Sequence, residues 1–198
     1  MPYSKEHTQK TKQRILDSAS RLFSRQGYDA ISIDDLMQDA GLTRGAFYHH
    51  FNDKAEVYAR AVFNAALRSP IATLPPMDDT AHWLNTVVDG YLNSEHIENA
   101  DIPCPLAFLA TDIGNRQSHA RKAYGRVYNG LVQAFSSRMG NFREEEKNDV
   151  AMAVSALLIG GVAISRALDS AETTEKLLSS CRQVAKQLLR ANEEQATA

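Results

Sequence analysis

The chain has 198 residues, of which 43% are hydrophobic and 23% are charged, so it can build a real core and is not a disordered tail. Its 22 Lys and Arg against 24 Asp and Glu give a net charge of −2, which excludes an overall basic nucleic-acid binder and leaves room only for a local basic surface. Residues 1–14 are polar and the longest apolar run, 150–164, is shorter than the ~20 residues that span a bilayer, so we expect a cytoplasmic protein without a signal peptide.

The N-terminal part begins with two predicted helices. Apolar residues recur at helical spacing over 8–26, and Gly27 stands where a left-handed residue would end that helix. Ser32 and Asp35 form a capping pair for a second helix, which keeps its apolar period until Gly41.

Further helices follow along the rest of the chain. Thr43 is placed to cap a third, short helix that ends near Asn52, and Asp53 with Glu56 is a capping pair for a fourth. Beyond the prolines after residue 69, five more helices are predicted at about 78–94, 104–113, 117–139, 144–168 and 172–191. Nine helices without a strand predict an all-α protein, with an N-terminal domain at 8–55 and a C-terminal domain at 56–191.

The stretch 33–51 has the pattern of a helix-turn-helix. Its apolar positions would fix two short helices at a steep angle; they are Ile33, Leu36, Met37, Leu42, Phe47 and Phe51. The second helix would begin with Thr43, Arg44, Gly45 and Ala46, the end that reaches base edges in a major groove. Arg44 is the only one of these four able to contact a guanine through two hydrogen bonds. Gly45 is a poor helix residue, and its presence is explained if a backbone must come close to DNA.

Charge supports this interpretation only locally. Residues 1–25 carry a net charge of +4, and the remainder of the chain carries −6. A basic arm at one end suits contact with phosphates. The alternative, that these charges form an ordinary solvated face, stays open.

Residues 10–58 resemble the DNA-binding domain of the TetR family of bacterial transcriptional regulators. The segment GLTRGAFYHHFNDK, which begins at Gly41, is the most specific part of the match. The resemblance implies an all-α fold, with three N-terminal helices for DNA and a variable C-terminal domain for ligand binding and dimerisation. It also implies a homodimeric repressor that a small molecule releases from a pseudo-palindromic operator.

Position by position, the resemblance implies DNA contacts from Ser32, Thr43, Arg44, Gly45, Ala46, Tyr48, His49 and Lys54. Tyr48, His49 and Lys54 would bind phosphates. Asp34 is a departure, because some relatives have a basic or polar DNA contact at that position.

The C-terminal half contains an interface candidate for a second copy of the chain. The run 150–164 is apolar nearly all round, which indicates burial on more than one side of a helix. With the final helix it would form a four-helix dimer interface, as the resemblance also implies. The candidate residues are Ala153, Ala156, Leu157, Gly160, Gly161, Ile164, Leu177, Val184 and Leu188. A purely intrachain core is the alternative.

An effector cavity is predicted between the fourth and eighth helices. Its candidate lining is aromatic and apolar with few polar groups, which favours a hydrophobic or aromatic molecule. The candidates are Tyr58, Phe63, Trp83, Val87, Tyr91, Cys104, Phe108, Thr111, Asp112, Tyr124 and Tyr128. Cys104 lies where a helix begins, so it is either a sensor of oxidants or electrophiles or a packing residue.

Neither a catalytic nor a metal-binding motif is present. The histidines His82, His96 and His119 are isolated in the sequence, and no metalloprotease, nucleophile-elbow or nucleotide-binding pattern occurs. We therefore predict no enzyme, no metal and no cofactor; the partners would be operator DNA, a small effector and a second copy. Two alternatives stay open, a helical small-molecule-binding protein or enzyme with an incidental helix-turn-helix head, and a sequence-tolerant architectural DNA protein.

Overall fold

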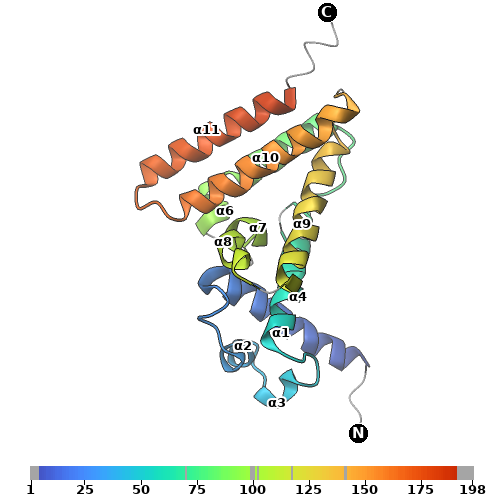
Figure 1. Cartoon of the computed structure of the whole chain (residues 1–198), viewed down its shortest axis with the longest axis vertical. Helices are drawn as coiled ribbons and strands as arrows, with labels where there is room; N and C mark the ends of the chain where they lie inside the picture. Colours follow the sequence, from blue (N-terminus) through green and yellow to red (C-terminus); the bar gives the residue numbers. More distant parts are fainter. Residues whose placement is uncertain are drawn as a thin grey trace, which may run out of the picture. The chain divides into compact units, whose positions relative to one another are not determined.

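The computed structural model describes residues 5–69, 71–98, 101, 103–116, 118–140 and 142–190. These residues form eleven α-helices and no strand (Figure 1), which confirms the all-α prediction. By packing, the chain divides into two compact units. Unit 1 comprises Met1–Ser69 and Asp101–Val127, and unit 2 comprises Pro70–Ala100 and Tyr128–Ala198. The functional boundary between residues 55 and 56 stays a prediction.

Unit 1 is built on its first and fourth helices. Helix α1 (Lys5–Gln26) packs along α4 (Lys54–Leu67), while α2 (Ile33–Asp39) contacts both α1 and α3 (Arg44–Phe47). Their apolar faces form one core, which includes Ile15, Ala19, Phe23, Leu36, Met37, Phe47, Phe51, Val57, Tyr58 and Val62. The helix-turn-helix therefore rests on the same core that joins α1 to α4.

A later segment of the chain completes this core. Helices α7 (Pro105–Phe108) and α8 (Ala110–Gly114) and the start of α9 (Ser118–Ser136) belong to unit 1. Buried side chains from this segment join the cluster of α1 and α4, namely Leu109, Ile113, Ala120 and Ala123. The single helix predicted at 104–113 is wrong, because Leu109 has φ −112° and separates α7 from α8.

The predicted helix ends near residues 27 and 32 are confirmed. Gly27 has φ +79°, the left-handed conformation expected of a residue that ends α1. The Ser32 hydroxyl accepts from the Asp35 amide at 3.1 Å, and the Asp35 carboxylate accepts from the Ser32 amide at 2.8 Å. This reciprocal pair satisfies two amides that α2 leaves without partners inside the helix.

Helix α3 is shorter than predicted, because it ends at Phe47 and not near Asn52. The Glu56 carboxylate accepts from both the backbone and the side-chain amide of Asn52 at 2.9 Å. Asn52 is thereby drawn into the cap of α4, where Asp53 accepts from the Glu56 amide at 2.7 Å. Asn52 therefore belongs to the start of α4 and not to the end of α3.

The single helix predicted at 78–94 is likewise two helices, α5 (Thr80–Tyr91) and α6 (Ser94–Glu98). The Asn93 side chain accepts from the His96 amide at 2.7 Å, so it starts a new helix directly after α5. These two divided helices raise the count from the predicted nine to eleven in the described part of the chain.

Unit 2 contains α5, α6, the later part of α9, α10 (Glu144–Ser165) and α11 (Ala171–Arg190). Helices α10 and α11 lie side by side (Figure 1). Both also contact α5. Buried residues of this unit include Trp83, Val87, Val88, Leu92, Phe135, Leu158, Val162, Leu178 and Ala185.

Helix α10 is long and apolar enough to cross a membrane, and it alone meets that criterion within the described ranges. Three glutamates occupy its first turn, and Val154, Leu158 and Val162 are buried in the protein. A core helix of a water-soluble protein has the same length and composition, so this helix is weak evidence for a membrane.

Candidate nucleic-acid interface

The start of α3 and its neighbours form one exposed surface. Six residues for which the sequence predicts DNA contacts are exposed on it: Ser32, Thr43, Arg44, Gly45, Tyr48 and His49. The other two, Ala46 and Lys54, are half-buried. We call these eight residues the recognition surface.

Buried aromatic rings hold this surface in place. Phe47 is fully buried, and its ring centroid lies 5.8 Å from that of Phe51 and 5.2 Å from that of Tyr48. Tyr48 itself is 56% exposed. Phe47 and Phe51 therefore anchor the helix, as predicted for the structural role of these two residues, while Tyr48 stands on the outer side.

Gly45 has no packing reason to be a glycine. A Cβ atom built on it would meet nothing within 4 Å. A glycine in a helix costs about 1 kcal/mol relative to alanine, so a residue with a side chain would be more favourable for the isolated chain. The missing side chain leaves the backbone of α3 bare at its outer face.

Arg44 is bound by two groups of the same unit. Its guanidinium donates to the Asp34 carboxylate on α2, and both side chains are 59% exposed. Interactions with Tyr48 and then with Asp34 raise the pKa of Arg44 above its ordinary value. The acid that departs from the family pattern is therefore the partner of the expected base-reading side chain.

A groove runs beside the recognition surface, and the sequence did not predict it. Helix α1 contributes His7, Thr8 and Thr11 to its wall, while Leu42, His50 and several recognition-surface residues line the rest. Burial, followed by the nearby charges of Lys12 and His49, lowers the pKa of His50. The first turn of α1 lies far from α3 in the sequence, so no local pattern could have joined the two.

The basic residues of α1 are partly engaged within the protein. Arg14 donates to the Ala40 carbonyl at 2.6 Å and thereby caps the end of α2. Arg21 forms an ion pair with Asp39, the last residue of α2. The local excess of positive charge is real, but these two cations hold α2 in place in addition to any contact with phosphates.

Lys54 begins α4, and its ammonium group lies 4.1 Å from the centroid of the Tyr28 ring. Burial lowers the pKa of Lys54. The predicted phosphate ligand therefore also has a cation–π partner inside unit 1.

Of the predicted effector residues, seven lie in unit 1: Tyr58, Phe63, Cys104, Phe108, Thr111, Asp112 and Tyr124. Tyr58 is buried and its hydroxyl donates to the Asp112 carboxylate. Arg116 binds Asp112 at 2.6 Å and Asp29 at 2.8 Å. Burial acts to raise the pKa of Asp112, but the hydrogen bonds from Arg116 and Tyr58 outweigh it and lower the pKa.

Thr111 and Cys104 differ in burial. Thr111 is exposed, and Cys104 is buried at the N-cap of the four-residue helix α7. A buried thiol commonly fills space, and the proposed sensor role of Cys104 stays a prediction. Within the ranges that the structure describes, no group of three or more His, Cys, Asp or Glu could hold a metal ion.

The other four predicted effector residues lie in unit 2. Trp83, Val87 and Tyr91 are buried on α5, and Tyr128 on α9 is half-buried. Next to them is a residue that sequence reasoning set aside as isolated. His96 is 6% exposed, its ring centroid lies 4.8 Å from that of Tyr91, and its Nε2 has no hydrogen-bond partner among the described residues.

His96 makes the stability of the fold dependent on pH. Burial lowers its pKa in the folded chain, whereas the unfolded imidazole titrates near 6.5. Between these two pKa values the unfolded chain binds more protons than the folded chain. The contribution of His96 to the free energy of unfolding is therefore fully present above pH 6.5 and is lost as the pH falls through that window. The loss is about 1.4 kcal/mol for each pKa unit that separates the two states.

We expect His96→Phe to remove this part of the loss between pH 7 and pH 5, as measured by urea unfolding at each pH. His82→Gln, on the exposed side of α5, is the control and should keep the wild-type loss. An equal loss in His96→Phe and in the wild type would contradict the assignment.

The predicted dimer residues form two stripes on unit 2. The exposed members are Ala153, Ala156, Ile164 and Val184, and the half-buried ones are Leu157, Gly160, Leu177 and Leu188. They recur at intervals of three, four and seven residues on α10 and at intervals of seven and four on α11, which places them on one face of each helix. We call these eight residues the apolar face.

Gly161 does not belong to the apolar face. It is buried, and a Cβ built on it would lie 2.8 Å from Leu92 and 3.3 Å from the sulfur of Cys181. Intrachain packing therefore requires this glycine. At Gly160 a Cβ would meet nothing within 4 Å, so that residue remains available for a partner.

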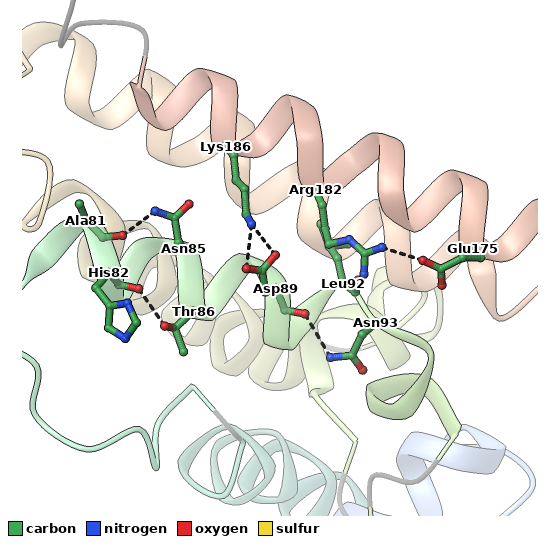
Figure 2. Close-up of polar contacts among 10 residues, drawn as sticks. All are labelled: Ala81, His82, Asn85, Thr86, Asp89, Leu92, Asn93, Glu175, Arg182 and Lys186. Atoms are coloured by element: carbon green, nitrogen blue, oxygen red, sulfur yellow. Dashed lines mark hydrogen bonds and ion pairs between the residues drawn. The ribbon is translucent and has the colours of Figure 1, made fainter.

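Polar contacts hold α11 against α5 on the side away from Val184. Lys186 on α11 binds both carboxylate oxygens of Asp89 on α5, at 2.6 and 2.7 Å, while Arg182 binds Glu175 within α11 at 2.6 Å (Figure 2). Arg182 also donates to the Leu92 carbonyl at 2.8 Å. The inner contact of α11 thus includes the Lys186–Asp89 ion pair and the hydrogen bond from Arg182 to Leu92, while apolar side chains stand on its outer side.

Comparison with known proteins places this chain among regulators. Residues 15–61 match the family model described as bacterial regulatory proteins, tetR family. The uncharacterized HTH-type transcriptional regulator YxaF of Bacillus subtilis is 25% identical over 165 residues, which are 78% of this chain and 84% of YxaF. The HTH-type transcriptional regulator AcrR of Shigella flexneri is 46% identical over 56 residues, 28% of this chain and 26% of AcrR.

Solved structures share the fold. A TetR transcriptional regulator from Chloroflexus aurantiacus superposes with a TM-score of 0.76 at 23% identity, covering 92% of this chain and 97% of that protein. The reduced form of NemR from E. coli gives a TM-score of 0.71 at 16% identity, covering 90% of this chain and 96% of NemR.

Proposed function

Because this chain belongs to the TetR family of bacterial transcriptional regulators, we propose that it is a homodimeric repressor released from a pseudo-palindromic operator by a small molecule. It acts in the cytoplasm, without catalysis, metal or cofactor. Its partners are double-stranded operator DNA, an effector and a second copy of the chain.

The recognition surface is the observation that carries this proposal. Thr43, Arg44 and Gly45 stand exposed at the start of α3, on a helix anchored by the buried ring of Phe47. This is the end of a recognition helix that enters a major groove. A bare backbone at Gly45 fits close approach to a DNA strand, because no packing contact among the described residues accounts for it.

The apolar face supports dimerisation. Large hydrophobic side chains on it stay exposed, with Ile164 at 53% and Val184 at 44%. Exposed apolar side chains that gather on one face mark sites of association, whereas single scattered ones do not. Two copies of the face would bury each other about a two-fold axis, and a palindromic DNA site mirrors that symmetry.

The effector is proposed to be hydrophobic or aromatic and to contact unit 2. Trp83, Val87, Tyr91 and Tyr128 supply aromatic and apolar surface. The buried Nε2 of His96 beside Tyr91 supplies a polar group that a bound molecule would satisfy. Release then requires that the effector bind the DNA-incompatible state more tightly than the operator-bound state.

The decisive experiment is selection of duplexes from random DNA with the purified protein, followed by a screen for compounds that release it. An affinity ratio of ~10³ or more between selected and unrelated DNA supports a specific regulator. A ratio near one would favour an architectural DNA protein. Turnover of a small molecule without any selected operator would favour the enzyme alternative.

Arg44 and Lys54 should differ in what they contribute to binding. We expect Arg44→Ala to lose about 10- to 100-fold of discrimination at one base pair of each half-site, because one bidentate base contact is worth ~1–3 kcal/mol. Lys54→Ala should weaken binding to all duplexes alike and lower the salt slope by about one per half-site.

Affinities for selected, altered and unrelated duplexes at several salt concentrations separate the two effects. Melting curves are needed for Lys54→Ala, because Lys54 also packs on Tyr28. If both variants bound the operator as tightly as the wild type at ~0.15 M salt, the assignment of DNA contacts to Arg44 and Lys54 would be wrong.

A further inference from the structure

An acidic side chain lies beside the arginine that we expect to read a base. Asp34 is in the first turn of α2 and Arg44 begins α3, and their ion pair joins the two helices of the helix-turn-helix. A helix N-terminus favours an acid and disfavours a cation. The pair therefore offsets an unfavourable position for Arg44.

An acid in the first turn of α2 stabilises that helix modestly, but general DNA affinity does not account for Asp34. An ion pair between side chains that are each 59% exposed contributes little to folding. A carboxylate on this surface repels phosphates and weakens the sequence-independent part of binding. The ion pair with Arg44 gives Asp34 a second effect, which acts on the arginine expected to read a base.

Arg44 is held from two sides. Asp34 binds it from α2, and Tyr48 interacts with it from the next turn of the chain. A long side chain that is already ordered loses less conformational freedom when it binds a target. The guanidinium has five N–H donors in a planar fork, so one edge can bind a carboxylate while another addresses a base.

We propose that Asp34 is a positioning residue that sets the base specificity of Arg44, by holding its guanidinium so that the outer N–H donors face a guanine. This inference rests on the proposed function, because it requires that Arg44 contact a base. Asp34 thereby lowers affinity for DNA in general and raises discrimination between sequences.

The test compares Asp34→Asn, Arg44→Ala and the double variant with the full-length wild type. Glu6→Gln is the charge-matched control, since Glu6 pairs with Lys10 on α1 and both side chains are largely exposed. Each protein is titrated with the selected operator, with an operator altered at the base pair that Arg44→Ala no longer distinguishes, and with an unrelated duplex. Circular dichroism and melting curves establish that each variant is folded.

We expect Asp34→Asn to bind the unrelated duplex at least as tightly as the wild type, while its preference for the intact over the altered operator falls about 3- to 10-fold, part of the discrimination that a bidentate contact supplies. In the Arg44→Ala background the same substitution should leave that preference unchanged. Glu6→Gln should change all three affinities by the same factor.

Two results would overturn the inference while leaving the proposed function intact. One is an unchanged preference in Asp34→Asn. The other is a loss of preference that persists in the Arg44→Ala background, because Asp34 would then read a base itself. If the wild type prefers no sequence at all, the proposed function fails, and this inference fails with it.

Discussion

Replacing Gly45 with leucine should abolish operator binding while leaving the fold intact. A side chain at this position would project from the outer face of α3 into open space, since nothing lies within 4 Å of a Cβ built there. Folding stability should be unchanged or higher by up to about 1 kcal/mol, because leucine is a better helix former than glycine. In the complex, the added side chain would stand between the α3 backbone and the DNA, and we expect an operator affinity at least about 100-fold weaker, the loss of one or two base contacts.

The measurements are operator titration and thermal melting of the same preparations. Gly161→Ala is the matched control, because its Cβ would lie 2.8 Å from a Leu92 methyl group. Overpacking of this kind costs about 1–3 kcal/mol and the gain in helix propensity offsets up to about 1 kcal/mol of it, so this variant should melt at the wild-type temperature or below, with no direct effect on DNA contacts. Full operator affinity in Gly45→Leu would show that the start of α3 does not approach DNA.

Placing charge on the apolar face should separate the dimer and collapse operator binding. The double variant Ile164→Glu, Val184→Glu sets carboxylates at two of its most exposed positions, where each monomer keeps them solvated. A dimer would have to bury them without partners, which is strongly unfavourable. A monomer contacts only one half-site, so we expect operator affinity to fall on the order of 1000-fold or more, toward non-specific binding.

Sedimentation or light scattering reports the oligomeric state, and titration reports the affinity. Leu67→Glu is the control, because Leu67 is a large hydrophobic residue that is 74% exposed on α4 in unit 1. That variant should remain dimeric. A double variant that stays dimeric with full affinity would place the dimer contact elsewhere on the chain.

Short-range sequence signals were sufficient to predict where α1 ends and where α2 begins in unit 1. Gly27 and the Ser32–Asp35 pair each act within four residues, so the C-terminal end of α1 and the start of α2 follow from the sequence, whereas α1 begins at Lys5 and not at residue 8. The predicted anchors Phe47 and Phe51 are buried, whereas Arg44 and Tyr48 are exposed.

Contacts between distant residues escaped prediction. The Asp34–Arg44 pair depends on the crossing of two helices, and the α1 side of the groove depends on how α1 lies beside α3. Likewise, the sequence alone does not distinguish Gly160 from Gly161. Successive residues of a helix point ~100° apart, so a Cβ on Gly160 would face open space whereas one on Gly161 would face Leu92. Only the packed structure distinguishes them.

The composition of unit 1 limits how such regulators can be recombined. Arg116 ties Asp29 to Asp112, and Ile113 and Ala123 fill part of the core beneath the helix-turn-helix. A hybrid that took only the first 69 residues from this chain would graft them onto foreign counterparts of those side chains. Unit 1, which contains the helix-turn-helix, is therefore made of two separate chain segments. A hybrid that preserves its core should take both segments from this chain.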